Sequence, residues 1–136
     1  MGKINLRWIE DHLMVASDSN GHSVVIGRSP EGDHPWVGVK PSDLLLVAVA
    51  SCSTWDVVEI LAKQRQPLER LEVFCTGEQQ GDPPYIFKHI HIRYEVRGKV
   101  DPEKLEKAIR LSEDKYCCVI NSLRPEVSIT SEYVIL

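Results

Sequence analysis

The feature that most constrains the fold is a stretch of apolar residues that begins at Pro41 and ends at Cys52. A proline followed two positions later by Asp43 suits the first turn of a helix, and the pattern predicts a helix that ends near Lys63. Residues 44–52 are apolar on nearly every side, so the helix must be covered over most of its surface. A small domain can cover it with its own core and with a partner chain, and we expect both.

The remainder of the chain predicts an α+β fold. Alternating apolar residues indicate a meander of three strands in the first 28 residues, and in the next hairpin Ile86 and Ile90 are expected on one inward face. The other expected elements are strands at 69–80, 85–97 and 127–135 and helices at 101–115 and 117–123. The order βββ-α-ββ-α-α-β then gives one domain, residues 1–136, with an antiparallel-rich sheet and segregated helices.

Composition and charge argue against several functions. The 136 residues carry a net charge of -4 without a dense basic stripe, so we expect no nucleic-acid partner. We also expect no membrane, because no apolar run approaches the roughly 20 residues that cross a bilayer. The start lacks the apolar core of a signal peptide, which favours a cytoplasmic protein. The sequence contains no GxSxG, Walker or dinucleotide-binding motif, so hydrolase, NTPase and dehydrogenase functions have no support.

Two cysteines in unlike surroundings are the main candidates for chemistry. Cys52 lies inside the apolar helix, whereas Cys117 stands where a later helix begins. Buried thiols are usually inert, and thiols at helix starts are usually more acidic than normal. A chain that brings one of each together has the parts of a two-cysteine redox site. Cys118 follows Cys117 directly, so only one of the two neighbours is expected to face Cys52.

The helix around Cys52 does not by itself explain a reactive thiol. Apolar neighbours raise a thiol's pKa, and an ionised Asp56 one turn away would raise it further. Activation would need a cation from elsewhere, and Arg28 at the end of the third strand is our candidate, because an arginine can pair with a thiolate and hold a peroxide oxygen. The ordinary alternative is that Cys52 is a core cysteine. Cys75 on a strand is interpreted as a core cysteine.

Two further features are weaker. His89 and His91 share one strand face, but no third or fourth ligand stands at a metal-site spacing, so we expect a solvated face, no metal and no cofactor. The segment from Arg28 to Lys40 is rich in proline and glycine and contains Trp36. Long loops of this kind often carry function.

Two segments together resemble one protein family. They are the helix Pro41–Cys52 and the later segment Tyr116-Cys117-Cys118-Val119, which is followed by Ser122 and Leu123. It is the OsmC/Ohr family, named for osmotically inducible protein C and organic hydroperoxide resistance protein. The resemblance covers the whole chain. It implies an intertwined homodimer with two active sites at the subunit interface.

The resemblance also implies a reaction. Cys52 would attack an organic hydroperoxide and become a sulfenic acid, and Cys117 would condense with it to a disulfide that a dithiol reductant, such as a lipoyl protein, reopens. A nearby second thiol protects a sulfenic acid from further oxidation. The substrate would contact apolar side chains, which favour hydrophobic peroxides: Leu45, Val49, Trp55 and Trp36.

The chain also departs from the family's peroxidases. They commonly carry a glutamate after the proline that precedes the cysteine helix, and it pairs with an arginine; here Ser42 takes that position and Asp43 follows. Cys118 stands where proline or serine is more usual. These departures resemble a divergent OsmC-like branch. The alternative function is a non-catalytic protein of the same fold that binds a small apolar ligand or senses redox state.

Overall fold

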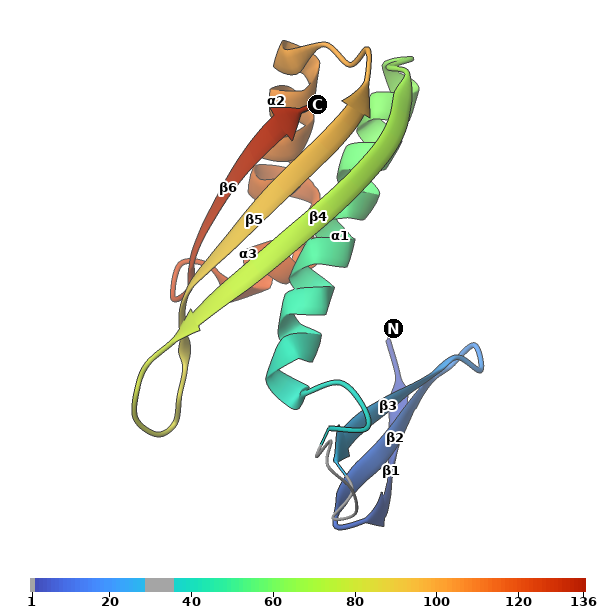
Figure 1. Cartoon of the computed structure of the whole chain (residues 1–136), viewed down its shortest axis with the longest axis vertical. Helices are drawn as coiled ribbons and strands as arrows, with labels where there is room; N and C mark the ends of the chain where they lie inside the picture. The colour runs from blue at the N-terminus through green and yellow to red at the C-terminus, as the bar shows by residue number, and fades with distance from the viewer. Residues whose placement is uncertain (1, 29–35) are drawn as a thin grey trace. The chain divides into compact units, whose positions relative to one another are not determined.

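The computed structural model describes residues 2–28 and 36–136, and its elements follow the predicted order. Three strands precede a long helix, a two-stranded hairpin, a run of helices and a last strand (Figure 1). This confirms the α+β class and the long central helix. The chain divides into two compact units, Met1–Leu45 and Leu46–Leu136, and each is described by itself.

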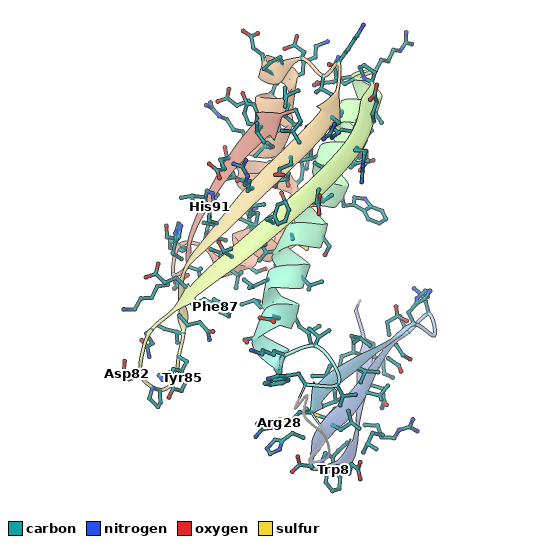
Figure 2. The ribbon with its side chains drawn as sticks, in the orientation of Figure 1. Trp8, Arg28, Asp82, Tyr85, Phe87 and His91 are labelled. Atoms are coloured by element: carbon teal, nitrogen blue, oxygen red, sulfur yellow. The ribbon has the colours of Figure 1, made fainter. Side chains whose placement is uncertain are left out.

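The first unit contains an antiparallel sheet in the order β1-β2-β3. Its strands are β1 (Ile4–Glu10), β2 (His12–Asp18) and β3 (Ser23–Arg28). The turn between β2 and β3 is closed by the Asp18 carboxylate, which accepts hydrogen bonds from the backbone N–H groups of Asn20 and His22 at 2.9 and 2.8 Å. The meander is therefore as predicted. Every residue of β1 is exposed, including Trp8 at 66% (Figure 2).

The segment after β3 returns to the sheet. Gly27 has a φ of 96°, and a Cβ there would lie 1.7 Å from the His12 carbonyl oxygen, so only glycine fits. Val39 then makes an isolated parallel bridge to Ile26. In the predicted loop, Trp36 stacks under the Lys40 ammonium, which lies 5.1 Å from the ring centroid. Residues 29–35 of this loop lie outside the described residues.

The predicted long helix is α1 (Pro41–Lys63), and within one chain it buries a single stripe. Its buried residues recur every four positions: Val49, Ser53, Val57 and Leu61. On another side of the helix, Trp55 is 75% exposed and Val47 and Val58 are also exposed. A four-residue spacing lines up one helical face, so the single chain does not cover the helix on most sides.

By length and composition alone, α1 is also apolar enough to cross a membrane. This corrects the expectation that no apolar run comes near that length. One such helix is weak evidence, because the core helix of a soluble protein passes the same test.

The second unit contains a sheet in the order β4-β5-β6. The strands are β4 (Leu68–Gln79), β5 (Phe87–Gly98) and β6 (Ser128–Ile135); β5 pairs antiparallel with β4 and parallel with β6. Along β5, residues Ile90, Ile92, Tyr94 and Val96 are buried and alternate with more exposed polar residues. The predicted inward position of Ile86 is wrong, because β5 begins one residue later and Ile86 is 53% exposed. Asp82 and Tyr85 lie in the connecting loop (Figure 2).

The helices of this unit pack on one face of its sheet (Figure 1). They are α2 (Pro102–Leu111), the π-helical turn η1 (Ser112–Tyr116) and α3 (Cys118–Leu123). The Asp101 carboxylate caps α2 by accepting a hydrogen bond from the Glu103 N–H at 2.9 Å. A single helix to Lys115 was predicted, whereas the backbone widens into a π turn after Leu111. The core joins these helices to α1 and β5: Val57, Leu61, Ile92, Tyr94, Leu105, Ile109 and Ile120.

Candidate thiol site

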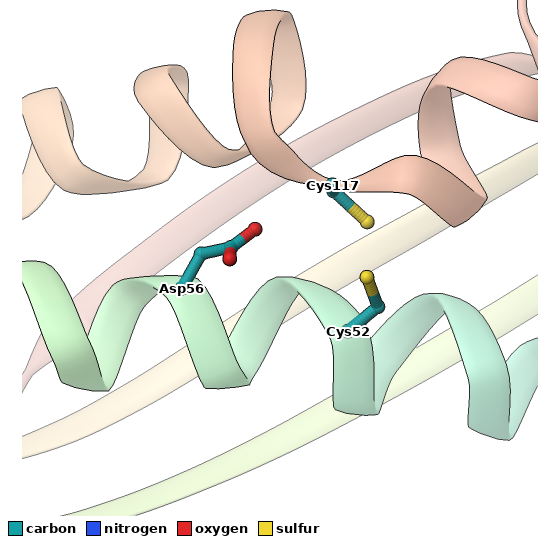
Figure 3. Close-up of side chains that lie close together, drawn as sticks. All are labelled: Cys52, Asp56 and Cys117. Carbon is teal, nitrogen blue, oxygen red and sulfur yellow. The ribbon is translucent and has the colours of Figure 1, made fainter. Parts of the chain in front are cut away.

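The second unit brings three thiols together where α1 meets the start of α3. The sulfur of Cys52 lies 3.9 Å from that of Cys118. The donor atoms of Cys52, Asp56 and Cys117 lie within 4.8 Å of one another (Figure 3). Cys117 is buried, Cys52 is half-buried and Cys118 is exposed. All three cysteines are free in this structure.

The chain was expected to have no metal site, but this cluster has the residue types of one. Two thiols and a carboxylate at such spacing are potential ligands for a metal ion. The sequence did not suggest this, because the ligands come from α1 and from a residue more than 60 positions away. Their spacing along the chain matches no metal motif.

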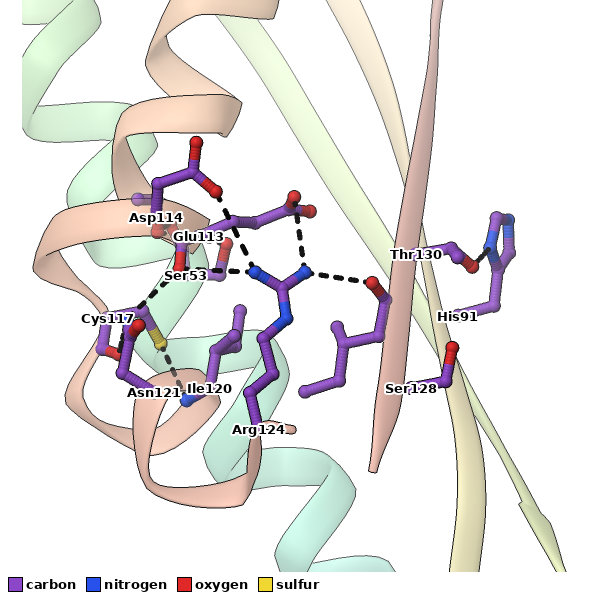
Figure 4. A network of polar contacts seen from close by, with 12 residues as sticks. Ser53, His91, Glu113, Asp114, Cys117, Ile120, Asn121, Arg124, Ser128 and Thr130 are labelled. Carbon is purple, nitrogen blue, oxygen red and sulfur yellow. Dashed lines mark hydrogen bonds and ion pairs between the residues drawn. The ribbon is translucent and has the colours of Figure 1, made fainter. Parts of the chain in front are cut away.

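A network of polar contacts fixes the segment that carries Cys117. The Cys117 backbone N–H donates to the Ser112 carbonyl at 2.7 Å, which closes the π turn. The Asn121 amide donates to the carbonyl oxygens of Glu113 and Cys117 at 3.0 and 2.8 Å. The Arg124 guanidinium lies 3.7 Å from the Glu113 carboxylate and donates to the Ile129 carbonyl at 2.8 Å (Figure 4). Strand β6, η1 and α3 are thereby joined.

A second network holds the Asp56 carboxylate beside the thiols. The Ser112 hydroxyl donates to Asp56 at 2.9 Å and to the hydroxyl of Ser53 at 3.2 Å. Ser53 in turn shares a hydrogen bond with the Tyr94 hydroxyl. Ser53 and Ser112 are fully buried, so these partners are needed to satisfy them. Sequence reasoning missed both serines, because a single small polar residue on a helix carries no signal of burial.

Cys52 is the acidic thiol of the site. Burial opposes its ionisation, but hydrogen bonding from the backbone N–H of Val119 and from the thiols of Cys117 and Cys118 favours the thiolate, and the net effect lowers the pKa of Cys52. Neighbours on α1 were not expected to make Cys52 reactive by themselves, and the groups that stabilise the thiolate do come from elsewhere in the chain. They are backbone N–H and thiol groups at the start of α3.

The other two thiols have raised pKa values for different reasons. Burial raises the pKa of Cys117 to about 12, although its sulfur accepts a hydrogen bond from the Ile120 N–H at 3.4 Å. The expected acidity of a thiol at a helix start is therefore wrong for Cys117, because desolvation outweighs the N–H group. The pKa of Cys118 is raised first by its hydrogen bond to Cys52 and then by the charge of that thiolate.

The structure does not gather all the predicted site residues around the thiols. Val49 is fully buried in the core. Trp55 instead lines an apolar groove of about 860 Å³ on α1 and β4, together with Val47, Ala50, Thr54, Val58, Leu71 and Val73. Arg28, Trp36 and Leu45 belong to the first unit, and their assignment to the site stays a prediction.

The remaining candidates agree with the sequence analysis. Cys75 is half-buried and packs against the core, as predicted. Burial raises the pKa of its thiol. His89 and His91 lie on the polar side of β5, where His91 bonds Thr130 at 2.8 Å and lies 3.3 Å from the Glu132 carboxylate. This is the polar strand face that the alternation predicted.

Taken together, the fold and the clustered thiols define a small α+β protein with thiol groups gathered between a long central helix and a short later helix. Comparison with known proteins agrees. A family model described as OsmC-like protein matches residues 31–132, and the chain belongs to the OsmC-like protein family.

Individual relatives extend this likeness over the whole chain. Protein YhfA of Escherichia coli K12 is 30% identical over 132 residues, which cover 96% of each protein, and it fits the predicted divergent branch. A hypothetical protein from Aquifex aeolicus VF5 has a TM-score of 0.85 and 30% identity, covering 100% of this chain and 98% of that one. The organic hydroperoxide resistance protein OhrB of Bacillus subtilis, at 18% identity, 98% coverage of both chains and a TM-score of 0.66, shares the fold.

Proposed function

We propose that the protein is a thiol-dependent peroxidase that reduces organic hydroperoxides. The observation that carries the proposal is the position of Cys52, whose thiolate is favoured by its surroundings and whose sulfur lies close to two further thiols. A peroxidatic thiol needs these two properties, because the thiolate is the nucleophile and a sulfenic acid needs a nearby partner. Membership of the OsmC-like family supports the same reading.

The reaction has two chemical steps. The Cys52 thiolate attacks the outer oxygen of the hydroperoxide, the O–O bond breaks, and the alkoxide takes up a proton and leaves as an alcohol. The resulting sulfenic acid condenses with Cys117, which forms an S–S bond and releases water. A dithiol reductant, such as a lipoyl protein, then returns both thiols to the reduced state. No metal or cofactor takes part in these steps.

We propose that the working form is a homodimer of a single domain, residues 1–136, in the cytoplasm. Support comes from apolar side chains that one chain leaves exposed: Ile4, Leu6 and Trp8 on β1 and Val47, Trp55 and Val58 on α1. Burying such side chains against a second copy would remove them from water. In this proposal, the partner helps to bring Arg28, Trp36, Leu45 and Trp55 toward the substrate, whereas Val49 stays in the core.

Mass spectrometry of the reduced protein before and after one equivalent of cumene hydroperoxide tests the proposal. We expect rapid loss of two hydrogens, with the new disulfide mapped to Cys52. Cys52→Ser should abolish peroxide consumption, whereas Cys75→Ala, which changes a thiol outside the cluster, should leave it unchanged. If Cys52 stays reduced while peroxide persists, the protein is not a peroxidase.

A second candidate is a protein of the same fold that binds a small apolar ligand or senses redox state without turnover. The apolar groove around Trp55 favours it, since ligand pockets are lined mainly by apolar side chains. Quenching of tryptophan fluorescence by an apolar ligand, absent in Trp55→Ala and combined with unreactive Cys52, would favour this function over the peroxidase.

A further inference from the structure

Cys118 is an exposed thiol within reach of the sulfur that the proposed reaction oxidises. It is the first residue of α3, directly after the buried Cys117. Its sulfur lies 3.9 Å from that of Cys52. An S–S bond is about 2.05 Å long, so a bond between them requires the sulfurs to approach by about 2 Å. Side-chain rotation at an exposed position can supply a movement of this size.

The two thiols that follow η1 differ in their access to solvent. Cys117 is fully buried and its backbone N–H closes the π turn, whereas Cys118 is exposed. A soluble dithiol can therefore reach the sulfur of Cys118 but not that of Cys117.

Resting on the proposed peroxidase function, we propose that Cys118 is a second resolving thiol and that the Cys52–Cys118 disulfide is the form that an external dithiol reduces. Cys117 forms a buried disulfide with Cys52, and Cys118 forms an exposed disulfide with Cys52. The electron donor belongs to the class of small dithiols or dithiol-bearing proteins.

The resolving step balances in atoms and electrons. The Cys118 thiolate attacks the sulfur of the Cys52 sulfenic acid, the S–S bond forms, and the S–O bond breaks. The departing hydroxide takes up a proton and becomes water. The two thiols together have then supplied the two electrons that reduced the hydroperoxide to its alcohol.

The reducing step follows from the exposure of Cys118. A donor thiolate attacks the exposed Cys118 sulfur, the S–S bond breaks, and Cys52 leaves as a thiolate. The donor's second thiol attacks its own mixed disulfide with Cys118, which releases Cys118 and leaves the donor oxidised to a disulfide. A Cys52–Cys117 disulfide would present no sulfur as exposed as Cys118, since Cys117 is fully buried.

The test compares the variants Cys117→Ser and Cys118→Ser, because each leaves a single neighbouring thiol that can form a disulfide with Cys52. Cys75→Ala is the matched control. Each reduced protein receives one equivalent of cumene hydroperoxide, followed by peptide mapping and dimedone labelling of sulfenic acid. Oxidised samples are then reduced with dihydrolipoamide under stopped flow. A parallel set is oxidised with diamide, which pairs thiols without a peroxide. Circular dichroism checks each fold, and Cys117→Ala replaces Cys117→Ser if the latter unfolds.

We expect Cys117→Ser to form a Cys52–Cys118 disulfide with either oxidant. We expect oxidised Cys118→Ser to be reduced by dihydrolipoamide at least about tenfold more slowly than the wild type, because the donor must reach a less accessible sulfur. The Cys75→Ala protein should match the wild type. A monothiol donor should leave a mixed disulfide on Cys118.

Two results would overturn the inference, and both differ from failure of the proposed function. One is a persistent sulfenic acid at Cys52 in Cys117→Ser and Cys117→Ala; the other is reduction of Cys118→Ser at the wild-type rate. If instead no variant reacts with the peroxide but diamide still links Cys52 to Cys118, the pairing stands and the peroxidase function fails.

Discussion

At the scale of single residues, hydrogen bonding decides which thiol is acidic. The backbone N–H of Val119 and two neighbouring thiols favour the Cys52 thiolate against the opposing effect of burial. Cys117 lies beside the same helix start, yet its complete burial raises its pKa. Position at a helix start is thus a weaker guide to thiol acidity than the balance of desolvation and donors around each sulfur.

This balance predicts an order of labelling with pH. With iodoacetamide, Cys52 should become reactive at a lower pH than Cys75 or Cys118, because its pKa is lowered while theirs are raised. Cys117, with a pKa of about 12 and no exposed surface, should react last. Mass spectrometry of samples quenched along a pH series gives the rate for each cysteine. Labelling of Cys52 and Cys75 with the same midpoint would contradict the lowered pKa of Cys52.

At the scale of elements, the π turn η1 places the thiols of Cys117 and Cys118 close to Cys52. Regular helical periodicity predicted one helix through Lys115, but η1 closes between Ser112 and Cys117 instead. A π turn holds extra residues per turn and is often found at functional sites. Here it ends α2 and lets Cys117 serve as the N-cap of α3, with its sulfur toward Cys52.

Replacing Arg124 tests whether its contacts hold η1 and α3 in place. Arg124→Met removes the hydrogen bond to Ile129 and the partner of the half-buried Glu113 carboxylate. We expect the free energy of unfolding to fall by about 1–3 kcal/mol and the disulfide to form more slowly, because α3 is less firmly placed. Urea unfolding and the single-turnover oxidation assay measure the two effects.

A matched control exists on α2. Arg110 pairs with Glu106 on an exposed helical face, so Arg110→Met should lower the free energy of unfolding by no more than about 0.5 kcal/mol. Equal losses of stability in the two variants would show that the Arg124 contacts have no special structural role.

At the scale of the whole molecule, one chain leaves large apolar side chains exposed, among them Trp8 on β1 and Trp55 on α1. The expectation that α1 is covered on most sides is not met within the chain, where only its inner stripe is buried. Part of that surface forms the apolar groove of about 860 Å³ beside Trp55. In the proposed homodimer, a second copy covers this surface.

Trp55→Asp tests that proposal. We expect the wild type to sediment as a dimer at micromolar concentration and the variant as a monomer, because a charge in an apolar interface is costly to desolvate. Phe74→Asp is the control, since Phe74 lies on the other face of β4, paired with Arg93. A Trp55→Asp protein that stays dimeric, or a monomeric wild type, would contradict the proposed assembly.

Local patterns predicted much of the fold. Strand alternation, the Asp101 cap and the apolar run from Pro41 are properties of neighbouring residues, and each element they indicated is present within a few residues. The errors lie where tertiary contacts compete with periodicity. The π turn after Leu111 and the outward Ile86 are both of this kind, because distant hydrogen bonds and strand pairing decide them.

The sequence by itself determined the order of elements, the family and the thiols on which the chemistry depends, since these follow from short-range pattern and residue type. Only the tertiary structure decided that Cys117 is buried, that Cys118 is exposed and near Cys52, and that Cys52 is the acidic thiol. The physical reason is that burial and hydrogen bonding at a sulfur depend on groups far away in the chain, and their balance exists only once α1 and α3 are packed together.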